Sequence, residues 1–479
     1  MALLKDYPQL RSVRDFVRRR RIPVYLVGGF LRDQILGRPC LDFDFTVDHS
    51  AIKLARAFAQ KIKGAFVLLD QEHGCARVVK KRQATTETYD FADFRGKDLL
   101  SDLKHRDFTI NTLCCEINSL KTGQTFDDVV SDSLKGRRDI EKKTIRMVSA
   151  RAFRDDPLRL LRAFSLRALL QFKIEPKTAQ TIALRKNLIR GVSAERIRDE
   201  LFKILQTDRA AENLKLMDKA GLLEKVLPQI AVMVGVRQGP YHHLDIWKHS
   251  LETVKQLETI LSISSADSKL MAYLSEPLGG DRSRLALLKL AALLHDIGKP
   301  QSLRRKSNKI YFYGHDRVGR RIVRQLAIDL KLSNNERRIL QDMVLWHLRP
   351  GYLSNFQQPT RRALFRYFRD TADEAVSIAL LSWADQRSTR GPLTSAADQV
   401  HHENICRDLI SEYFRAKDQK PFTRLINGHD LIRRLKLKPS PHFSRILNGI
   451  EEQQAAGKLK TKQEALAWAK RAAARLKNP

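Results

Sequence analysis

Two aspartates separated by one residue are the first side chains of the chain that could carry out chemistry. Asp42 and Asp44 lie in the segment Leu41–Val47, where apolar and polar residues alternate at the start. Because alternate residues of a strand point to the same face, both carboxylates are expected on one side of a strand. Such a pair can hold a Mg²⁺ ion that also binds phosphate oxygens, although a surface strand with solvated aspartates has the same pattern. Asp90, in a later predicted strand, is a third candidate whose direction the alternation leaves open.

A glycine pair shortly before these aspartates predicts a phosphate-binding turn. Val24–Val27 is predicted to be a short buried strand and Phe30–Leu36 a helix. Between them, Gly28 and Gly29 allow a tight turn whose backbone can approach a ligand closely. Free N–H groups and the dipole at the start of the helix favour an anion, and Arg32 adds a positive charge in the first turn. We therefore predict a triphosphate next to the two carboxylates.

Two further polar clusters follow along the chain. In the first, Arg106, Asp107 and Asn111 stand where a basic cluster changes into an apolar stretch. The aspartate and the asparagine can form hydrogen bonds inside a core, but ordinary helix capping explains the pattern equally well.

The second cluster is Asp156, Arg159 and Arg162, at helical positions i, i+3 and i+6. Pro157 is tolerated only in a first turn, so the helix is predicted to begin near Asp155 or Asp156. An aspartate and an arginine on a rigid helix can offer an acceptor and several donors to the edge of a nucleobase, which makes the protein the template. The alternative is a ladder of charges on the surface.

Histidines and aspartates form a separate constellation between residues 240 and 390. Neutral imidazoles and carboxylates on helices are the ligands of a hydrolytic site with one or two metal ions. A single histidine would more often be structural, but the order H…HD…H…H…D resembles the HD phosphohydrolase superfamily. The residues are His249, His295, Asp296, His315, His347 and Asp385.

The composition favours a polyanionic partner. The 479 residues include 88 Lys and Arg against 54 Asp and Glu, a formal net charge of +34. A field of this sign fits RNA or DNA. Five cysteines without zinc spacing or a disulfide framework fit a reducing compartment. Without a signal-peptide core or a membrane-spanning apolar run, we expect a cytoplasmic protein that does not contact a membrane.

The strand, glycine turn and Asp-x-Asp segment together resemble the nucleotidyltransferase signature of the tRNA nucleotidyltransferase/poly(A) polymerase family, of the bacterial and eukaryotic type. The resemblance covers nearly the whole chain. It implies an α+β, polymerase-β-like nucleotidyltransferase head followed by all-α neck, HD and tail domains. The expected domains are the head at 1–150, the neck with the base-selecting motif at 151–215, the HD domain at 216–414 and an RNA-binding tail at 415–479.

In this family the first polar cluster corresponds to the R-R-D-F-T-I-N motif, which helps to bind ribose and triphosphate. Arg106, Asp107 and Asn111 match the motif, whereas His105 replaces its first arginine.

The second polar cluster corresponds to the family's E-D-x-x-R motif, which selects the nucleotide. Asp156 and Arg159 match this motif, and the nucleotide-binding set extends to Arg162. Asp155 replaces the longer glutamate, and Ser165 stands where a basic residue is often found, so base selection departs from the common pattern.

The segment Val192–Leu201 resembles the family's neck motif. Ser193 is the expected N-cap of a helix there. The resemblance implies that Glu195 and Arg196 brace the template helix.

The resemblance implies Mg²⁺-dependent transfer of C and/or A from CTP and ATP to the 3′ end of tRNA, with release of pyrophosphate. Asp42 and Asp44 would be catalytic, and Gly28, Gly29 and Arg32 would hold the triphosphate. The HD site would hold a second divalent transition metal, with a second phosphohydrolase activity. The alternatives are a poly(A) polymerase and an HD phosphohydrolase with an RNA-binding N-terminal domain.

One segment bears on which bases are added. Only Gly96–His105 separates the strand region from the first polar cluster, whereas full CCA-adding relatives usually carry a longer flexible loop there. We therefore expect a partial enzyme that adds CC, or one that works with a partner that adds A.

Overall fold

The structure is a computed structural model that describes residues 3–82, 85–121, 123–307, 309–418, 423–438, 440 and 442–477. The chain divides into two compact units. The first comprises Met1–Ile204 and Leu216–Val226, and the second comprises Leu205–Lys215 and Leu227–Pro479. Among the described residues, no helix is long and apolar enough to cross a membrane.

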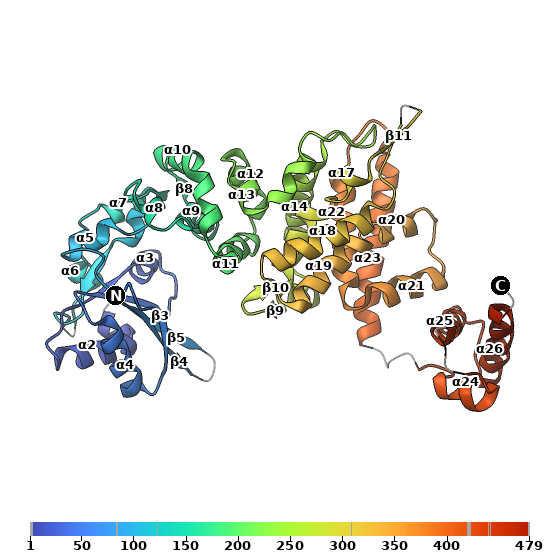
Figure 1. Ribbon diagram of the computed structural model, residues 1–479, viewed down its shortest axis with the longest axis horizontal. Helices are drawn as coiled ribbons and strands as arrows, with labels where there is room; N and C mark the ends of the chain where they lie inside the picture. The colour runs from blue at the N-terminus through green and yellow to red at the C-terminus, as the bar shows by residue number, and fades with distance from the viewer. Residues whose placement is uncertain are drawn as a thin grey trace. The chain divides into compact units, whose positions relative to one another are not determined.

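The first unit contains a six-stranded sheet in the order β3-β4-β5-β2-β1-β6 (Figure 1). Strands β2 and β5 are parallel, and the other neighbouring strands are antiparallel. The strands are β1 (Val24–Val27), β2 (Asp42–Val47), β3 (Ala65–Asp70), β4 (Cys75–Lys81), β5 (Thr86–Asp93) and β6 (Cys114–Glu116). The mixed sheet confirms the α+β fold expected for the head.

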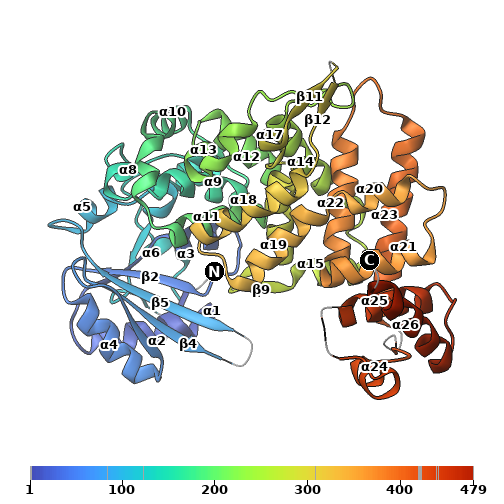
Figure 2. The same cartoon turned by 45° about the vertical axis from the view of Figure 1, so that its right-hand side comes forward.

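Helices α2 (Pro8–Arg18) and α4 (Ala51–Ile62) pack on one face of this sheet (Figure 2). The aromatic side chains of the central strands point towards them, and the Phe58 ring lies 5.2 Å from Tyr89 and 5.8 Å from Phe91. Because side chains alternate along a strand, burying Phe43 and Phe45 against this layer sends the aspartates of β2 to the opposite face. The hydrophobic core thus orients the candidate catalytic carboxylates.

The rest of the first unit is mostly helical, with a small two-stranded sheet of β7 (Thr144–Ile145) and β8 (Lys173–Ile174). Its remaining α-helices are α1 (Leu3–Asp6), α3 (Gly29–Ile35), α5 (Leu99–Lys104), α6 (Phe126–Val129), α7 (Gly136–Glu141), α8 (Ala152–Asp155), α9 (Arg159–Leu170), α10 (Pro176–Arg185), α11 (Ala194–Leu205) and α13 (Leu223–Val226). Helix α12 (Ala210–Lys219) and α11 span the division between the units.

The template helix begins later than the sequence suggests. We expected it to start near Asp155 or Asp156, but α9 starts at Arg159, and Asp156 has the extended dihedrals φ −147° and ψ 99°. A residue before proline is driven out of the helical region by the proline ring, so Pro157 separates α8 from α9. The prediction that Asp156 shares the helix with Arg159 is therefore wrong.

The second unit is built on buried helices and two hairpins that the sequence did not predict, β9–β10 and β11–β12. Its helices before the tail are α14 (Ile246–Ile263), α15 (Ser268–Ser275), α16 (Arg284–Leu294), α17 (Lys299–Ser302), α18 (His315–Asp329), α19 (Asn334–Trp346), α20 (Arg349–Ser354), α21 (Arg361–Thr371), α22 (Ala375–Ser388) and α23 (Ala396–Lys417). The hairpin strands are β9 (Pro277–Gly279), β10 (Arg282–Ser283), β11 (Arg304–Lys306) and β12 (Lys309–Tyr311).

Three helices form the tail: α24 (Gly428–Leu435), α25 (His442–Ala455) and α26 (Lys462–Lys477). They share a small apolar core that includes Leu431, Ile446 and Ile450. Two segments of the expected RNA-binding tail fall partly outside the described residues, at Pro421, Phe422, Pro439 and Pro441.

Candidate active site and candidate metal centre

The glycine turn has the predicted form. Gly28 has φ +83° and ψ −143°, a conformation that essentially only glycine adopts, and α3 begins at the next residue. A Cβ atom on Gly28 would lie 2.8 Å from Oδ2 of Asp44. The turn therefore brings backbone against the candidate catalytic carboxylate, where any side chain would collide with it.

Strand pairing answers the question about Asp90. In the parallel β2–β5 pair, Asp42 is opposite Thr88 and Asp44 is opposite Asp90. Asp90 therefore lies beside Asp44, and both line the same cavity. Arg77 holds Asp90 by two hydrogen bonds of 2.7 Å, and the hydroxyl of Thr88 donates to Asp42 Oδ1.

The surroundings of Asp44 disfavour the ionised form of its carboxyl group. Burial is the largest effect and raises the pKa of its carboxyl group, Arg106 acts in the opposite direction, and the charge of Asp90 raises the pKa further. The net result is a pKa above the ordinary value. A site in which a half-buried carboxylate lies beside another carboxylate favours a bound cation.

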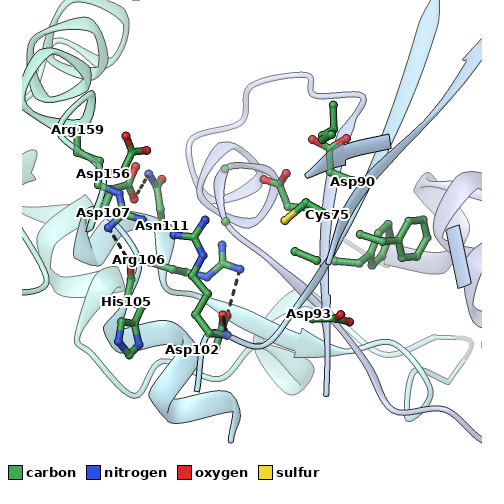
Figure 3. A pocket seen from close by; sticks show the side chains of 18 of the residues that line it. Cys75, Asp90, Asp93, Asp102, His105, Arg106, Asp107, Asn111, Asp156 and Arg159 are labelled. Atoms are coloured by element: carbon green, nitrogen blue, oxygen red, sulfur yellow. Dashed lines mark hydrogen bonds and ion pairs between the residues drawn. The ribbon is translucent and has the colours of Figure 1, made fainter. Parts of the chain in front are cut away.

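A cavity of about 330 Å³ collects residues from all three predicted clusters (Figure 3). Figure 3 shows Asp90, Cys75 and Asp93 from the strands on one side, and the arginines and acids of the other two clusters on the other side. Of the predicted site residues, the cavity lining includes Gly28, Gly29, Asp44, Arg106, Asp107, Asn111, Asp156, Arg159 and Arg162. It also includes Arg95 and Asp102, which the sequence reasoning did not single out.

Asp42 and Arg32 do not line this cavity. Arg32 is buried, donates to Asn111 Oδ1 at 2.6 Å and forms two hydrogen bonds with Asp33. Its contacts hold the polar cluster next to α3, and direct contact with a triphosphate stays a prediction.

Asp107 joins the first and second polar clusters. Arg162 Nε lies 3.1 Å from Asp107 Oδ2, and the amide of Asn111 donates to Oδ1 at 3.0 Å. Burial alone would raise the pKa of Asp107, but Arg162, Arg159 and these hydrogen bonds hold it below the ordinary value. The carboxyl group is therefore ionised and fixes the orientation of the arginine.

The base-selecting residues are held by different partners. Asp156 Oδ2 lies 2.8 Å from Arg196 Nη2, so Arg196 holds a residue that precedes α9, whereas bracing of the template helix itself stays a prediction. Arg159 is buried and donates from Nη1 to the carbonyls of His105 at 2.8 Å and Ala152 at 3.1 Å. His105, which replaces the first arginine of the motif, thus contributes its backbone carbonyl. The residue type at this position does not reveal that role.

Ser165, where relatives often have a basic residue, is buried, and its hydroxyl donates to Glu200 and to the carbonyl of Arg162. The short segment before the first cluster contains the helix α5, which covers Leu99–Lys104. Asp98 caps it by accepting from Ser101 N at 2.7 Å, and Asp102 accepts from the N–H of Arg95 at 3.1 Å.

The six predicted histidines and aspartates of the second unit come together. His249 Nε2 lies 2.9 Å from Asp385 Oδ1, and His295 Nε2 lies 3.2 Å from Asp296 Oδ2. In the described part of the chain, metal-ligating atoms lie within 4.8 Å of one another in two groups, His249 with His295 and Asp385, and Asp296 with His315 and His347. The head carboxylates form no such group among those residues.

Backbone contacts set the tautomers of three of these histidines. His295, His315 and His347 each direct Nδ1 to the carbonyl three residues earlier, at 2.9, 2.8 and 2.7 Å. In the neutral, metal-ligating form of each ring the proton therefore belongs on Nδ1, and Nε2 faces the site. Nε2 of His315 and Nε2 of His347 lie only 3.4 Å apart. A bound cation would offset the repulsion between their lone pairs.

The charges of this centre are strongly coupled. Burial, with the charges of His295 and His315, lowers the pKa of His347 to about 3, so its imidazole is neutral. Burial also opposes a charge on His295, but Asp296 and Asp385 outweigh it and raise its pKa to about 10. Lys299, 2.6 Å from Asp296, and His242, with its ring 4.9 Å from that of His249, also belong to the centre and were not foreseen.

Together, a mixed-sheet head with a nucleotide-sized polar cavity and a helical unit with a histidine–aspartate centre define a two-domain nucleotidyltransferase. The sequence matches the "Poly A polymerase head domain" over residues 24–146, the "Probable RNA and SrmB- binding site of polymerase A" over residues 171–233 and the "HD domain" over residues 246–403. The chain belongs to the tRNA nucleotidyltransferase/poly(A) polymerase family.

Relatives along the full length support this assignment. The A-adding tRNA nucleotidyltransferase of Deinococcus radiodurans is 31% identical over 474 residues, which cover 95% of this chain and 98% of the relative. The CC-adding tRNA nucleotidyltransferase of Thermus thermophilus is 29% identical over 451 residues, 92% of each chain. A solved CCA-adding enzyme with ATP has the same fold, with a TM-score of 0.65 at 19% identity over 100% of this chain and 97% of the other.

Proposed function

We propose that the chain adds nucleotides from CTP and/or ATP to the 3′ end of tRNA and releases pyrophosphate. The observation that carries this proposal is the single cavity that Gly28, Asp44, Asp107 and Asp156 line together. It combines a backbone turn that suits phosphates, a carboxylate for the reaction centre and polar groups for the base. The similarity to an A-adding and a CC-adding tRNA nucleotidyltransferase supports tRNA as the acceptor.

Each part of the cavity has a role in this proposal. The N–H groups at Gly28 and Gly29 and the guanidinium of Arg106 hold the triphosphate. Asp156, fixed by Arg196, accepts a hydrogen bond from the base. Arg159 uses Nη1 for two backbone carbonyls, which orients the remaining donors of its fork towards the base.

A Mg²⁺ ion fits the carboxylates of the head. Asp42 and Asp44 would hold it, with Asp90 beside them. The raised pKa of Asp44, to which the charge of Asp90 contributes, favours a cation there. When bound, the ion supplies Lewis-acid stabilisation of the charge that develops on the α-phosphate.

We infer that the enzyme adds C residues and not the terminal A. The support is α5, an ordered helix capped by Asp98 and tied by Asp102 to the backbone of Arg95, in the place of the longer flexible loop of full CCA-adding relatives. In this proposal, a short connection held by these hydrogen bonds limits the change of shape that a switch from C to A requires.

Incubation of the protein with tRNA that lacks CCA, with CTP and ATP separately and together, tests the proposal. Addition of two C residues and no A is expected. Addition of all three nucleotides would overturn the restriction to C, and long A tracts on arbitrary RNA would favour a poly(A) polymerase. Asp44→Asn should abolish transfer, and Asp48→Ala, which removes an exposed carboxylate of the same region, should not. Full activity of Asp42→Ala would favour an RNA-binding head attached to a phosphohydrolase.

We propose a second activity, metal-dependent hydrolysis of a phosphoester, for the HD centre. The support is that the Nε2 atoms of histidines converge on two carboxylates, with the ring tautomers fixed by backbone carbonyls. Lys299 lies at the same centre and can bind a phosphate oxygen. His249, His295, Asp296, His315, His347 and Asp385 would hold one or two divalent transition-metal ions. Release of p-nitrophenol from bis(p-nitrophenyl) phosphate in the presence of Mn²⁺, Co²⁺ or Ni²⁺ tests this activity, with His295→Ala as the inactive control. A rate equal to that of the variant would contradict it.

A further inference from the structure

A β-hairpin next to the HD centre presents a basic and aromatic surface that neither site uses. Strands β11 and β12 extend away from the helices of the second unit (Figures 1 and 2). In their register, Arg304 is opposite Tyr311 and Lys306 is opposite Lys309. Because paired residues and alternate residues share a face, these four side chains belong to one face of the hairpin.

Two tyrosines extend this face towards the HD centre. The rings of Tyr311 and Tyr313 are stacked, with centroids 5.5 Å apart and planes at 10°. Tyr313 is 79% exposed, so the outer face of the pair is open. His315, a member of the metal centre, follows two residues later. We call Arg304, Lys306, Lys309, Tyr311 and Tyr313 the hairpin surface.

The charges of the hairpin surface are not compensated. Its three cations are exposed, and within the described residues no carboxylate forms an ion pair with them. By contrast, Lys255 and Lys269, elsewhere on this unit, are each paired with an acid. A hollow of about 870 Å³ beside the hairpin adds further basic side chains, because Arg237 and Arg305 line it with Lys306.

This combination favours one partner, a single-stranded RNA. Unpaired cations on a ribbon attract a chain of phosphates, and an open aromatic ring stacks on a nucleobase. Stacking requires a base that is not already paired, so a duplex can use the cations but not the tyrosine. An acidic protein would likewise leave the stacked rings without a function.

We propose that the hairpin surface binds single-stranded RNA, with phosphates on Arg304, Lys306 and Lys309 and an unpaired base on Tyr313. The RNA so bound lies beside the HD centre. The proposal depends neither on nucleotidyl transfer nor on hydrolysis, because it concerns binding alone.

Fluorescence anisotropy with a 5′-fluorescein-labelled 12-nucleotide oligo(U) and the full chain tests the proposal. Tyr313→Ala should weaken binding about tenfold, as expected for one lost stack, and Tyr313→Phe should bind as the wild type does. Replacing Arg304, Lys306 and Lys309 by alanine should reduce the slope of log K against log salt by about 2, since each phosphate contact on a single strand contributes about 0.7.

A matched triple variant, Lys215→Ala with Lys255→Ala and Lys269→Ala, removes the same charge from cations that are paired with acids. Equal weakening by both triple variants would overturn the proposal, because net charge alone would then explain it. Unchanged thermal unfolding shows that each variant is folded.

Cross-linking locates the RNA independently of affinity. With a 4-thiouridine oligonucleotide of the same length, the cross-link should fall in the tryptic peptide Ile310–Arg317, which contains both tyrosines. Absence of a cross-link from this peptide would overturn the proposal. A 12-base-pair RNA duplex that loses as much affinity from Tyr313→Ala as the single strand does would overturn the assignment of an unpaired base.

Discussion

Replacing Gly28 with alanine probes the contact between the glycine turn and the carboxylate of Asp44. At φ +83° and ψ −143°, a side chain costs about 1–3 kcal/mol in backbone strain. The new Cβ would also lie 2.8 Å from Asp44 Oδ2 and must move that atom by about 0.6 Å to reach the ordinary contact distance of 3.4 Å. Because a displacement of about 1 Å at a reacting group can reduce a rate roughly 10²-fold, we expect kcat to fall at least tenfold.

The assay is incorporation of labelled CMP into tRNA that lacks CCA, with urea unfolding of the same samples. Gly37→Ala is the matched control, because Gly37 also has a positive φ, +65°, but a Cβ there would meet nothing within 4 Å. It should lose about 1–2 kcal/mol of stability and keep kcat. A Gly28→Ala enzyme with normal kcat, or a Gly37→Ala enzyme with an equally reduced kcat, would refute the reasoning.

Three further predictions concern charge. Without metal, ionising the half-buried Asp44 costs stability, because its folded pKa is raised and stability falls as the pH rises from the unfolded to the folded pKa. At pH 7.5 in EDTA, Asp44→Asn should therefore unfold at a higher temperature than the wild type. At a pH below the ordinary aspartate pKa, the two proteins should unfold at the same temperature. Equal unfolding temperatures at pH 7.5 would contradict this prediction. Arg196→Ala frees Asp156 and removes a partly exposed ion pair, worth about 0.2–1 kcal/mol, so the kcat/KM ratio of correct to incorrect nucleotide should fall up to about fivefold. An equal loss for all nucleotides would argue against base selection. Adding Mn²⁺ at a hundred times its Kd should stabilise the HD transition by about 2.7 kcal/mol in calorimetry, whereas His295→Ala should show no shift.

The sequence determined the local parts of the active site. Gly28 predicts a turn because essentially only glycine adopts its dihedrals, and the turn is there, with α3 beginning at Gly29. The alternation around Asp42 and Asp44 predicts a shared face because the period of a strand is two, and the buried Phe43 between them and Phe45 after them enforce it. Such inferences succeed because their physical cause lies within a few residues of the chain.

Pro157 acts on both of its sides. It is compatible with the first turn of a helix, but its stronger effect is on the residue before it. That effect moves Asp156 out of the helix and towards Arg196.

Only the tertiary structure decided how distant segments combine. Asp90 lies beside Asp44 because β2 pairs in parallel with β5, and pairing partners depend on packing of the whole sheet. His105 contributes its backbone carbonyl, which accepts a hydrogen bond from Arg159. Because every residue has a backbone carbonyl, the sequence does not indicate this role. In the HD centre, residue types suggested a metal, but the carbonyls that hold each Nδ1 decide that Nε2 faces inward. The sequence alone shows which residues are able to carry out chemistry. Their partners and orientations depend on contacts between distant segments, which only folding brings together.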